Sequence, residues 1–101
     1  MIMVTKEEAI KYLSDAPAEQ CFWANDGHVL KNISELAGAF LQMNKDIYSY
    51  HANKEKNDFS KWIGDIIGDK KLANDLLSAK TKDSAVKKLN SRLALLKKKA
   101  E

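Results

Sequence analysis

Apolar residues recur at three- and four-residue intervals along most of this chain, a spacing that places side chains on one face of a helix. The interval is clearest in the segment 57–67, where the apolar residues are Phe59, Trp62, Ile63, Ile66 and Ile67. Asn57 can cap the start of this helix, because its side-chain oxygen can accept from a free backbone amide. Gly68 can end the helix in a left-handed conformation, and Asp69 can cap the next one.

Two helices are predicted in the first half of the chain. Thr5 and Glu8 can each satisfy a free amide of the other's residue, so a helix begins after Thr5 and stops near Asp15, ahead of a proline. Asn32 caps a second helix, whose apolar face holds Ile33, Leu36, Ala37, Phe40 and Leu41. The segment 44–51 stays open between a bent continuation of that helix and a separate short turn.

The last third of the chain predicts a short helix and a long one. Leu72, Ala73, Leu76 and Leu77 line the short helix. The long helix begins at Thr81 or Asp83, and its apolar residues step by three, four and three to form a seam: Val86, Leu89, Leu93 and Leu96. Such a seam can dock on the bundle or on another chain, so Leu89 and Leu93 are candidate protein contacts.

The segment 20–30 differs from the rest because its two apolar runs flank a turn. Asp26-Gly27 between those runs predicts a β-hairpin, since a tight turn needs the positive φ that glycine adopts easily. Successive residues of a strand point to opposite faces, so Phe22 and Trp23 cannot both lie under the helices. An exposed Trp23 would be a protein-contact site.

These patterns predict a mainly α fold, a compact bundle of about five helices with a short β-hairpin near residues 20–30. We expect one domain over residues 1–101, with a basic end, 97–101, that frays beyond the packed part. No apolar run reaches the roughly 18 residues of a membrane-spanning helix, and charge follows the first residues too closely for a secretory leader. The single cysteine, Cys21, fits a reducing compartment, so we expect a cytoplasmic protein without membrane contact.

Charge is divided unevenly along the chain, although the net charge is only +3. Residues 1–69 hold seven Lys and eleven Asp or Glu, a balance of −4, whereas residues 70–101 hold ten Lys or Arg and three acids, a balance of +7. The basic third either solubilises a long helix or binds an anion such as nucleic acid. The candidate contacts for nucleic acid are Lys80, Lys87, Lys88, Arg92, Lys97 and Lys98.

Groups that carry chemistry are few. The sequence lacks short metal-ligand pairs, a glycine-rich phosphate loop and the sequence context of a nucleophilic serine. A metal could be held by His51 with Asp58, Asp65 or Asp69, and Cys21 with His28 or His51 could form a thiol nucleophile. Helix capping and burial of the thiol explain these residues more simply. We therefore expect no enzymatic activity, no metal or other cofactor, and no small-molecule ligand.

The order of motifs between Phe22 and Leu96 carries a resemblance. Tyr50-His51 precedes an Asn-Asp-Phe-x-x-Trp-Ile segment at 57–63, and Gly68-Asp69 precedes Leu72-Ala73. This order resembles an uncharacterised family of small prokaryotic helical domains without an established activity, so the resemblance implies a fold rather than a mechanism. The residues of the pattern, which we expect to serve the scaffold, are His51, Asn57, Asp58, Phe59, Trp62, Gly68 and Asp69.

The sequence therefore favours a non-catalytic interaction module that binds a protein partner or a second copy of itself. The alternative is nucleic-acid binding without sequence specificity, in which lysines of the last helix neutralise phosphates without contacting bases. A single arginine and the lack of a known nucleic-acid-binding motif count against that alternative.

Overall fold

The computed structural model describes residues 3–101, which form six α-helices and one two-stranded antiparallel sheet. The mainly α fold with a short β-hairpin is thereby confirmed. The helices are α1 (Lys6–Leu13), α2 (Ile33–Gln42), α3 (Lys45–His51), α4 (Asp58–Trp62), α5 (Lys70–Ser78) and α6 (Lys82–Ala100). The short elements are the 3₁₀ turn η1 (Ala18–Gln20), the π-helical turn η2 (Ile63–Ile67) and the strands β1 (Phe22–Trp23) and β2 (Val29–Leu30).

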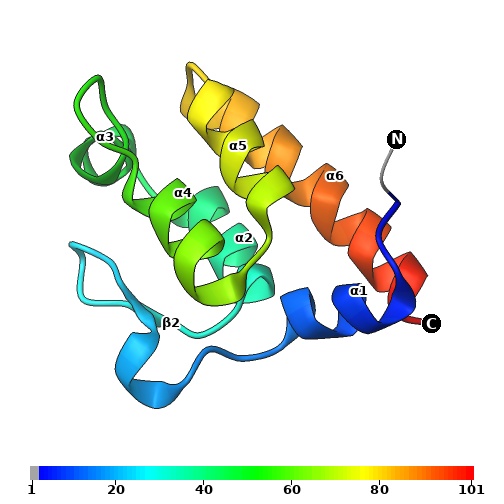
Figure 1. Cartoon of the computed structure of the whole chain (residues 1–101). Coiled ribbons are helices and arrows are strands. Elements are labelled where there is room, and N and C mark those ends of the chain that lie inside the picture. The colour runs from blue at the N-terminus through cyan, green and yellow to red at the C-terminus, as the bar shows by residue number, and fades with distance from the viewer. Residues whose placement is uncertain (1–2) are drawn as a thin grey trace.

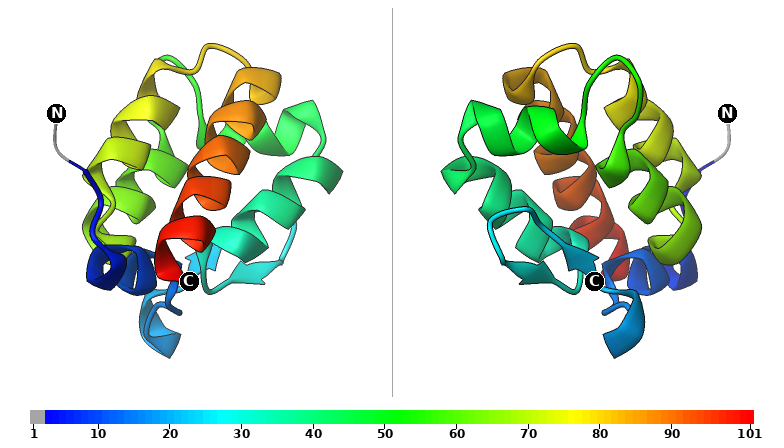
Figure 2. Two further views of the ribbon diagram at one scale, coloured as in Figure 1. Left: turned by 90° about the vertical axis from the view of Figure 1, so that its right-hand side faces the viewer. Right: turned by 90° about the vertical axis from the view of Figure 1, so that its left-hand side faces the viewer.

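Helix α6 is the central element of the bundle. It packs against α1, α2 and α5, and α1 crosses the end of α6 that carries the C-terminus (Figures 1 and 2). The apolar seam of α6 fills this interior, where Leu89 and Leu96 are fully buried and Leu93 nearly so. The hypothesis that Leu89 and Leu93 contact another protein is therefore wrong, because this chain's own helices cover both side chains.

Capping residues set the starts of the helices where the sequence predicts them. Thr5 and Glu8 form a complete capping box, in which each side chain accepts from the other's backbone amide at 3.0–3.1 Å. Asn44 caps α3, which settles the open segment as a separate helix, because the residue before it is already extended. At the other end of the chain α6 continues to Ala100, and Lys97–Lys99 lie where positive charge suits the helix dipole.

The predicted helix at 57–67 has two backbone geometries. It begins as α4, capped by Asn57, and continues as the wider π-helical turn η2. Gly68 ends this helix in the predicted left-handed conformation, with φ 93°. The N–H of Gly68 donates to the carbonyl oxygen of Ile63 at 2.7 Å. Asp69 then caps α5.

Helices α4 and α5 approach closely along small and polar side chains. Where α4 continues as η2, a Cβ atom placed on Gly64 would lie 3.3 Å from the Cβ of Ala73, so this tight contact favours glycine at position 64. The buried hydroxyl of Ser60 donates to the carbonyl oxygen of Ala73 at 2.7 Å. The amide of Asn57 donates to the carbonyl oxygen of Leu76 at 3.2 Å, so the cap of one helix also binds the end of the other.

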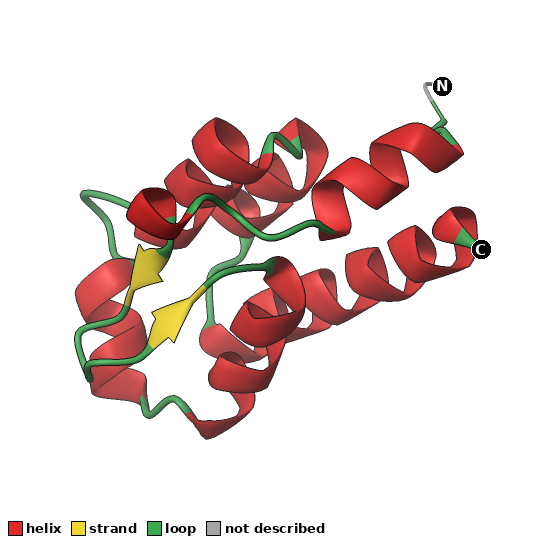
Figure 3. Ribbon diagram, turned by 90° about the horizontal axis from the view of Figure 1, so that it is seen from below, coloured by secondary structure: helices red, strands yellow, loops and turns green. Residues whose placement is uncertain are grey.

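The hairpin lies at the side of the bundle, away from the end of α6 (Figure 3). Its turn centres on Asn25 and Asp26, and the N–H of Gly27 donates to the carbonyl oxygen of Ala24 at 2.9 Å. Gly27 takes the positive φ, 95°, that follows such a turn. No helix among residues 3–101 is both long and apolar enough to cross a membrane.

Candidate functional site

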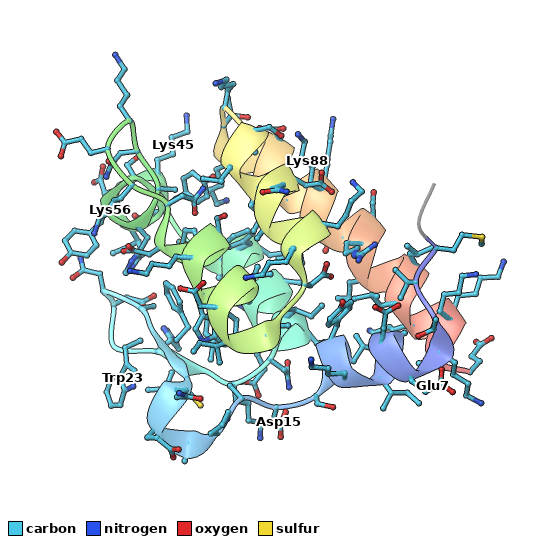
Figure 4. The ribbon with its side chains drawn as sticks, in the orientation of Figure 1. Glu7, Asp15, Trp23, Lys45, Lys56 and Lys88 are labelled. Atoms are coloured by element: carbon cyan, nitrogen blue, oxygen red, sulfur yellow. The ribbon has the colours of Figure 1, made fainter. Side chains whose placement is uncertain are left out.

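The two faces of the hairpin differ in burial. In its register Phe22 pairs with Leu30 and Trp23 with Val29. Phe22 and Leu30 lie in the core, whereas Trp23 is 69% exposed and Val29 is 44% exposed. Figure 4 shows Trp23 directed away from the ribbon. We call Trp23 and Val29 the hairpin face; the sequence singled out Trp23 but missed Val29, which the register of the hairpin could have identified.

The buried half of the hairpin joins an aromatic cluster. The ring of Phe22 stacks on that of Phe59 with 5.1 Å between centroids and meets the edges of His51 and Trp62 at 5.1 and 5.8 Å. Trp62 also donates its indole N–H to the carbonyl oxygen of Gln20 at 2.8 Å. The hairpin is thus held to α3 and α4 from the inside, and its outer face has a fixed position.

His51 links the hairpin turn to the start of α4. The backbone N–H of Asn25 donates to its Nε2 at 2.9 Å, and its Nδ1 lies 2.9 Å from a carboxylate oxygen of Asp58. Both bonds form only when Nδ1 carries the proton and Nε2 accepts. Both ring nitrogens of this buried histidine are therefore used within the fold, in the structural role expected for it.

The metal and thiol alternatives find no support in this geometry. Of the three aspartates considered with His51, only Asp58 contacts it. Asp69 pairs with Arg92 in the interior, and Asp65 is exposed. Across residues 3–101, no three His, Cys, Asp or Glu side chains gather closely enough to hold a metal ion. The thiol of Cys21 donates to the carbonyl oxygen of Pro17 at 3.5 Å.

Asp58 supplies a pH-dependent contribution to stability. Burial raises its pKa, but hydrogen bonds from His51 and Lys56 outweigh burial and leave the pKa below its usual value. A carboxyl whose pKa is lower in the folded state stabilises the fold above its unfolded pKa. That stabilisation is lost as the pH falls through the folded pKa.

We therefore expect the Asp58→Asn variant to be less stable than the wild type at neutral pH, and the difference to shrink below about pH 4. Asparagine keeps an oxygen for His51 but loses the charge that attracts Lys56. Urea unfolding followed by circular dichroism at about pH 7, 5 and 3 measures the difference. A difference that grows as the pH falls would contradict the assignment.

Arg92 does not belong with the surface lysines, and its prediction as a nucleic-acid contact is wrong. Its Nε and Nη2 each donate to a carboxylate oxygen of Asp69 at 2.8 Å, with Arg92 9% and Asp69 1% exposed. Asp69 also accepts from the backbone N–H of Leu72 at 3.1 Å. The guanidinium is thus occupied by a buried ion pair that joins α6 to the start of α5.

The lysines of α6 do not form one positive face. A residue turns by about 100° in a helix, so Lys87 and Lys98 lie opposite the buried leucines, while Lys88 and Lys97 lie on the two flanks. The amine of Lys88 donates to the hydroxyl of Ser78 at 2.8 Å (Lys88 is labelled in Figure 4). Lys80 precedes the helix and is exposed.

The residues that carry the family resemblance have structural roles. Asn57 and Asp69 cap helices, Phe59 and Trp62 are buried in the core, and Gly68 ends the π-helical turn. These roles agree with a scaffold and leave membership of that family a prediction. No protein-family model, curated protein or solved structure matches this chain.

Proposed function

We propose that this chain is a non-catalytic protein-interaction module whose hairpin face inserts Trp23 into an apolar pocket of a partner protein. The observation that carries the proposal is the exposure of a tryptophan on a hairpin whose other face is fixed in the core. Tryptophan is enriched among the residues that dominate binding energy in protein interfaces. A fixed anchor also binds with a smaller entropic cost than a mobile loop.

The size of the hairpin face favours a different protein over a second copy of this chain. Stable interfaces bury about 800 Å² per partner, which two side chains cannot supply. An indole that enters a pocket needs less surface on its own side, because the partner encloses it. The exposed Asp26 and His28 at the turn would lie at the polar rim of such a contact.

Nucleic-acid binding is less well supported, because the chain's only arginine is paired with Asp69 in the interior. The lysines that remain lie on different sides of α6 and do not form one binding face. His51, the residue closest to a catalytic role, is fully engaged by Asn25 and Asp58, which supports the non-catalytic part of the proposal. The single cysteine fits the reducing cytoplasm that we propose as its location.

We expect Trp23→Ala to abolish partner binding while leaving the stability of the fold close to that of the wild type. An exposed side chain contributes little to folding, whereas a buried interface anchor contributes about 2 kcal/mol or more to binding. The measurement is affinity capture on the immobilised chain, followed by titration of the captured protein against each variant. Leu41→Ala is the matched control, because Leu41 is 70% exposed on α2.

Three outcomes would contradict the proposal. A captured protein that binds Trp23→Ala as tightly as the wild type would place the contact elsewhere. Capture that disappears after nuclease treatment would favour the nucleic-acid alternative. Sedimentation of the free chain as a stable dimer, disrupted by Trp23→Ala, would replace the foreign partner with a second copy.

A further inference from the structure

A cleft of about 620 Å³ opens between the loop 52–57 and the segment 77–80, and no hairpin residue lines it. Its volume falls in the range of small-molecule sites, roughly 300–1,000 Å³. The lining residues whose side chains could contact a ligand are Tyr48, Lys54, Glu55, Leu77, Ala79 and Lys80. They come from α3, the loop after it and the end of α5, so no local stretch of sequence contains the site.

Tyr48 lines this cleft, and its hydroxyl forms no hydrogen bond with the described residues. Its side chain is more than nine-tenths buried, with the ring stacked on Phe59 at 5.6 Å and against the edge of Phe40 at 5.9 Å. Buried tyrosine hydroxyls ordinarily have a hydrogen-bond partner. The Tyr48 hydroxyl has no such partner among the described residues. Every fully enclosed side-chain nitrogen or oxygen atom in those residues does have a partner, so the Tyr48 hydroxyl must be in contact with solvent. Burial raises the pKa of Tyr48, which keeps the hydroxyl protonated and able to donate.

Two of the three lysines that line the cleft are free to bind an anion. Lys56 is held by Asp58 at 3.0 Å and lies over the ring of Tyr50 at 4.8 Å. Lys54 and Lys80 form no ion pair within the part of the chain that the structure covers. Glu55 is the only carboxylate that lines the cleft. The free donors there are therefore two ammonium groups and one hydroxyl.

The loop wall of the cleft is formed in advance by its own hydrogen bonds. The backbone N–H of Asn53 donates to the carbonyl oxygen of Lys56 at 2.9 Å, and the side-chain oxygen of Asn53 accepts from the backbone N–H of Glu55, also at 2.9 Å. Ala52 and Asn57 pair as an antiparallel bridge. A ligand would thus meet a shaped surface and would not have to order the loop, which favours binding.

The opposite wall combines the apolar side chains of Leu77 and Ala79 with Lys80. Leu77 lies at the end of α5 with an exposed side chain, and Ala79 follows it. We propose that the cleft binds a small organic anion, whose acidic group meets Lys54, Lys80 and the Tyr48 hydroxyl while its apolar body covers Leu77. This site is separate from the hairpin face and does not depend on the proposed protein partner.

The test uses two aromatic probes of similar shape, the anionic 8-anilinonaphthalene-1-sulfonate and the neutral N-phenyl-1-naphthylamine. We expect the anion to bind the folded chain more tightly, because only the anion can pair with the lysines. Amide chemical shifts recorded during the titration should change in residues 52–57 and 77–80. Equal binding of both probes, no binding at millimolar concentration, or shifts confined to other segments would overturn the proposal.

Variants separate the contributions of charge and hydroxyl. The double change Lys54→Met and Lys80→Met should raise the Kd for the anionic probe by about tenfold, since it removes two charge pairs. Lys45→Met with Lys61→Met, two exposed lysines outside the cleft, is the matched control and should leave the Kd unchanged. Tyr48→Phe should raise the Kd several-fold without lowering stability, because the hydroxyl has no internal partner to lose. An unchanged Kd in either the cleft lysine pair or Tyr48→Phe would refute the assigned contacts.

Discussion

Replacing Arg92 by methionine is expected to lower the free energy of unfolding by about 3–5 kcal/mol. The change leaves the carboxylate of Asp69, which is 1% exposed, without its two hydrogen bonds from the guanidinium. The bond from the Leu72 amide remains but cannot offset a buried charge. Urea unfolding followed by circular dichroism measures the loss.

The double variant Asp69→Asn with Arg92→Met is the informative control. Asparagine still caps α5, and the pair then contains no charge, so the double variant should be more stable than Arg92→Met alone. Removing both members of a buried pair is often far less costly than removing one. An Arg92→Met variant within about 1 kcal/mol of the wild type would show that the pair is open to water in solution.

Leu89→Ala is expected to destabilise the fold by about 2–5 kcal/mol, because it leaves a cavity at the contact of α6 with its neighbours. Leu89 is fully buried at the centre of the bundle. Leu95→Ala is the matched control: the same chemical change on the same helix, at an exposed position, should cost less than about 1 kcal/mol. Thermal and urea unfolding of both variants, at several protein concentrations, give the comparison.

The concentration series tests whether the α6 seam packs inside one chain in solution, as the structure shows. If Leu89 packs inside one chain, the loss of stability is the same at every concentration. A midpoint that rises with protein concentration in the wild type and no longer does so in Leu89→Ala would mean that the seam joins two chains.

Helix positions could be predicted from the sequence because local rules determine them. The capping pair at Thr5 and Glu8, the left-handed glycine at position 68 and the 3.6-residue spacing around Phe59 all involve neighbouring residues. The π-helical turn at Ile63–Ile67 could not be predicted, because its apolar spacing also suits an ordinary helix. The close approach to Ala73 of α5 occurs within this turn, at Gly64.

Features that join distant residues were beyond the sequence patterns. The spacing at Leu89 is the same whether the seam packs within one chain or between two. Helical spacing places Arg92 beside the seam, three residues after Leu89 and four before Leu96, but its partner Asp69 lies 23 residues earlier and no local pattern identifies it. The alternation of Phe22 and Trp23 predicts opposite faces, but only the position of Phe59 shows which of them is buried. The cleft at Tyr48 could not be predicted either, because one of its walls is formed by Leu77, Ala79 and Lys80, which are distant from Tyr48 in the sequence.

The position of the chain ends has a practical consequence for presenting the hairpin. Helix α1 begins and α6 ends on the side of the molecule opposite the strands (Figures 1 and 3). A tag, a surface linkage or a fused domain joined after Glu101 would therefore orient Trp23 outward, toward whatever approaches from solution. Immobilisation through that end keeps the indole accessible, whereas random coupling through lysines would attach many molecules with the hairpin turned toward the support.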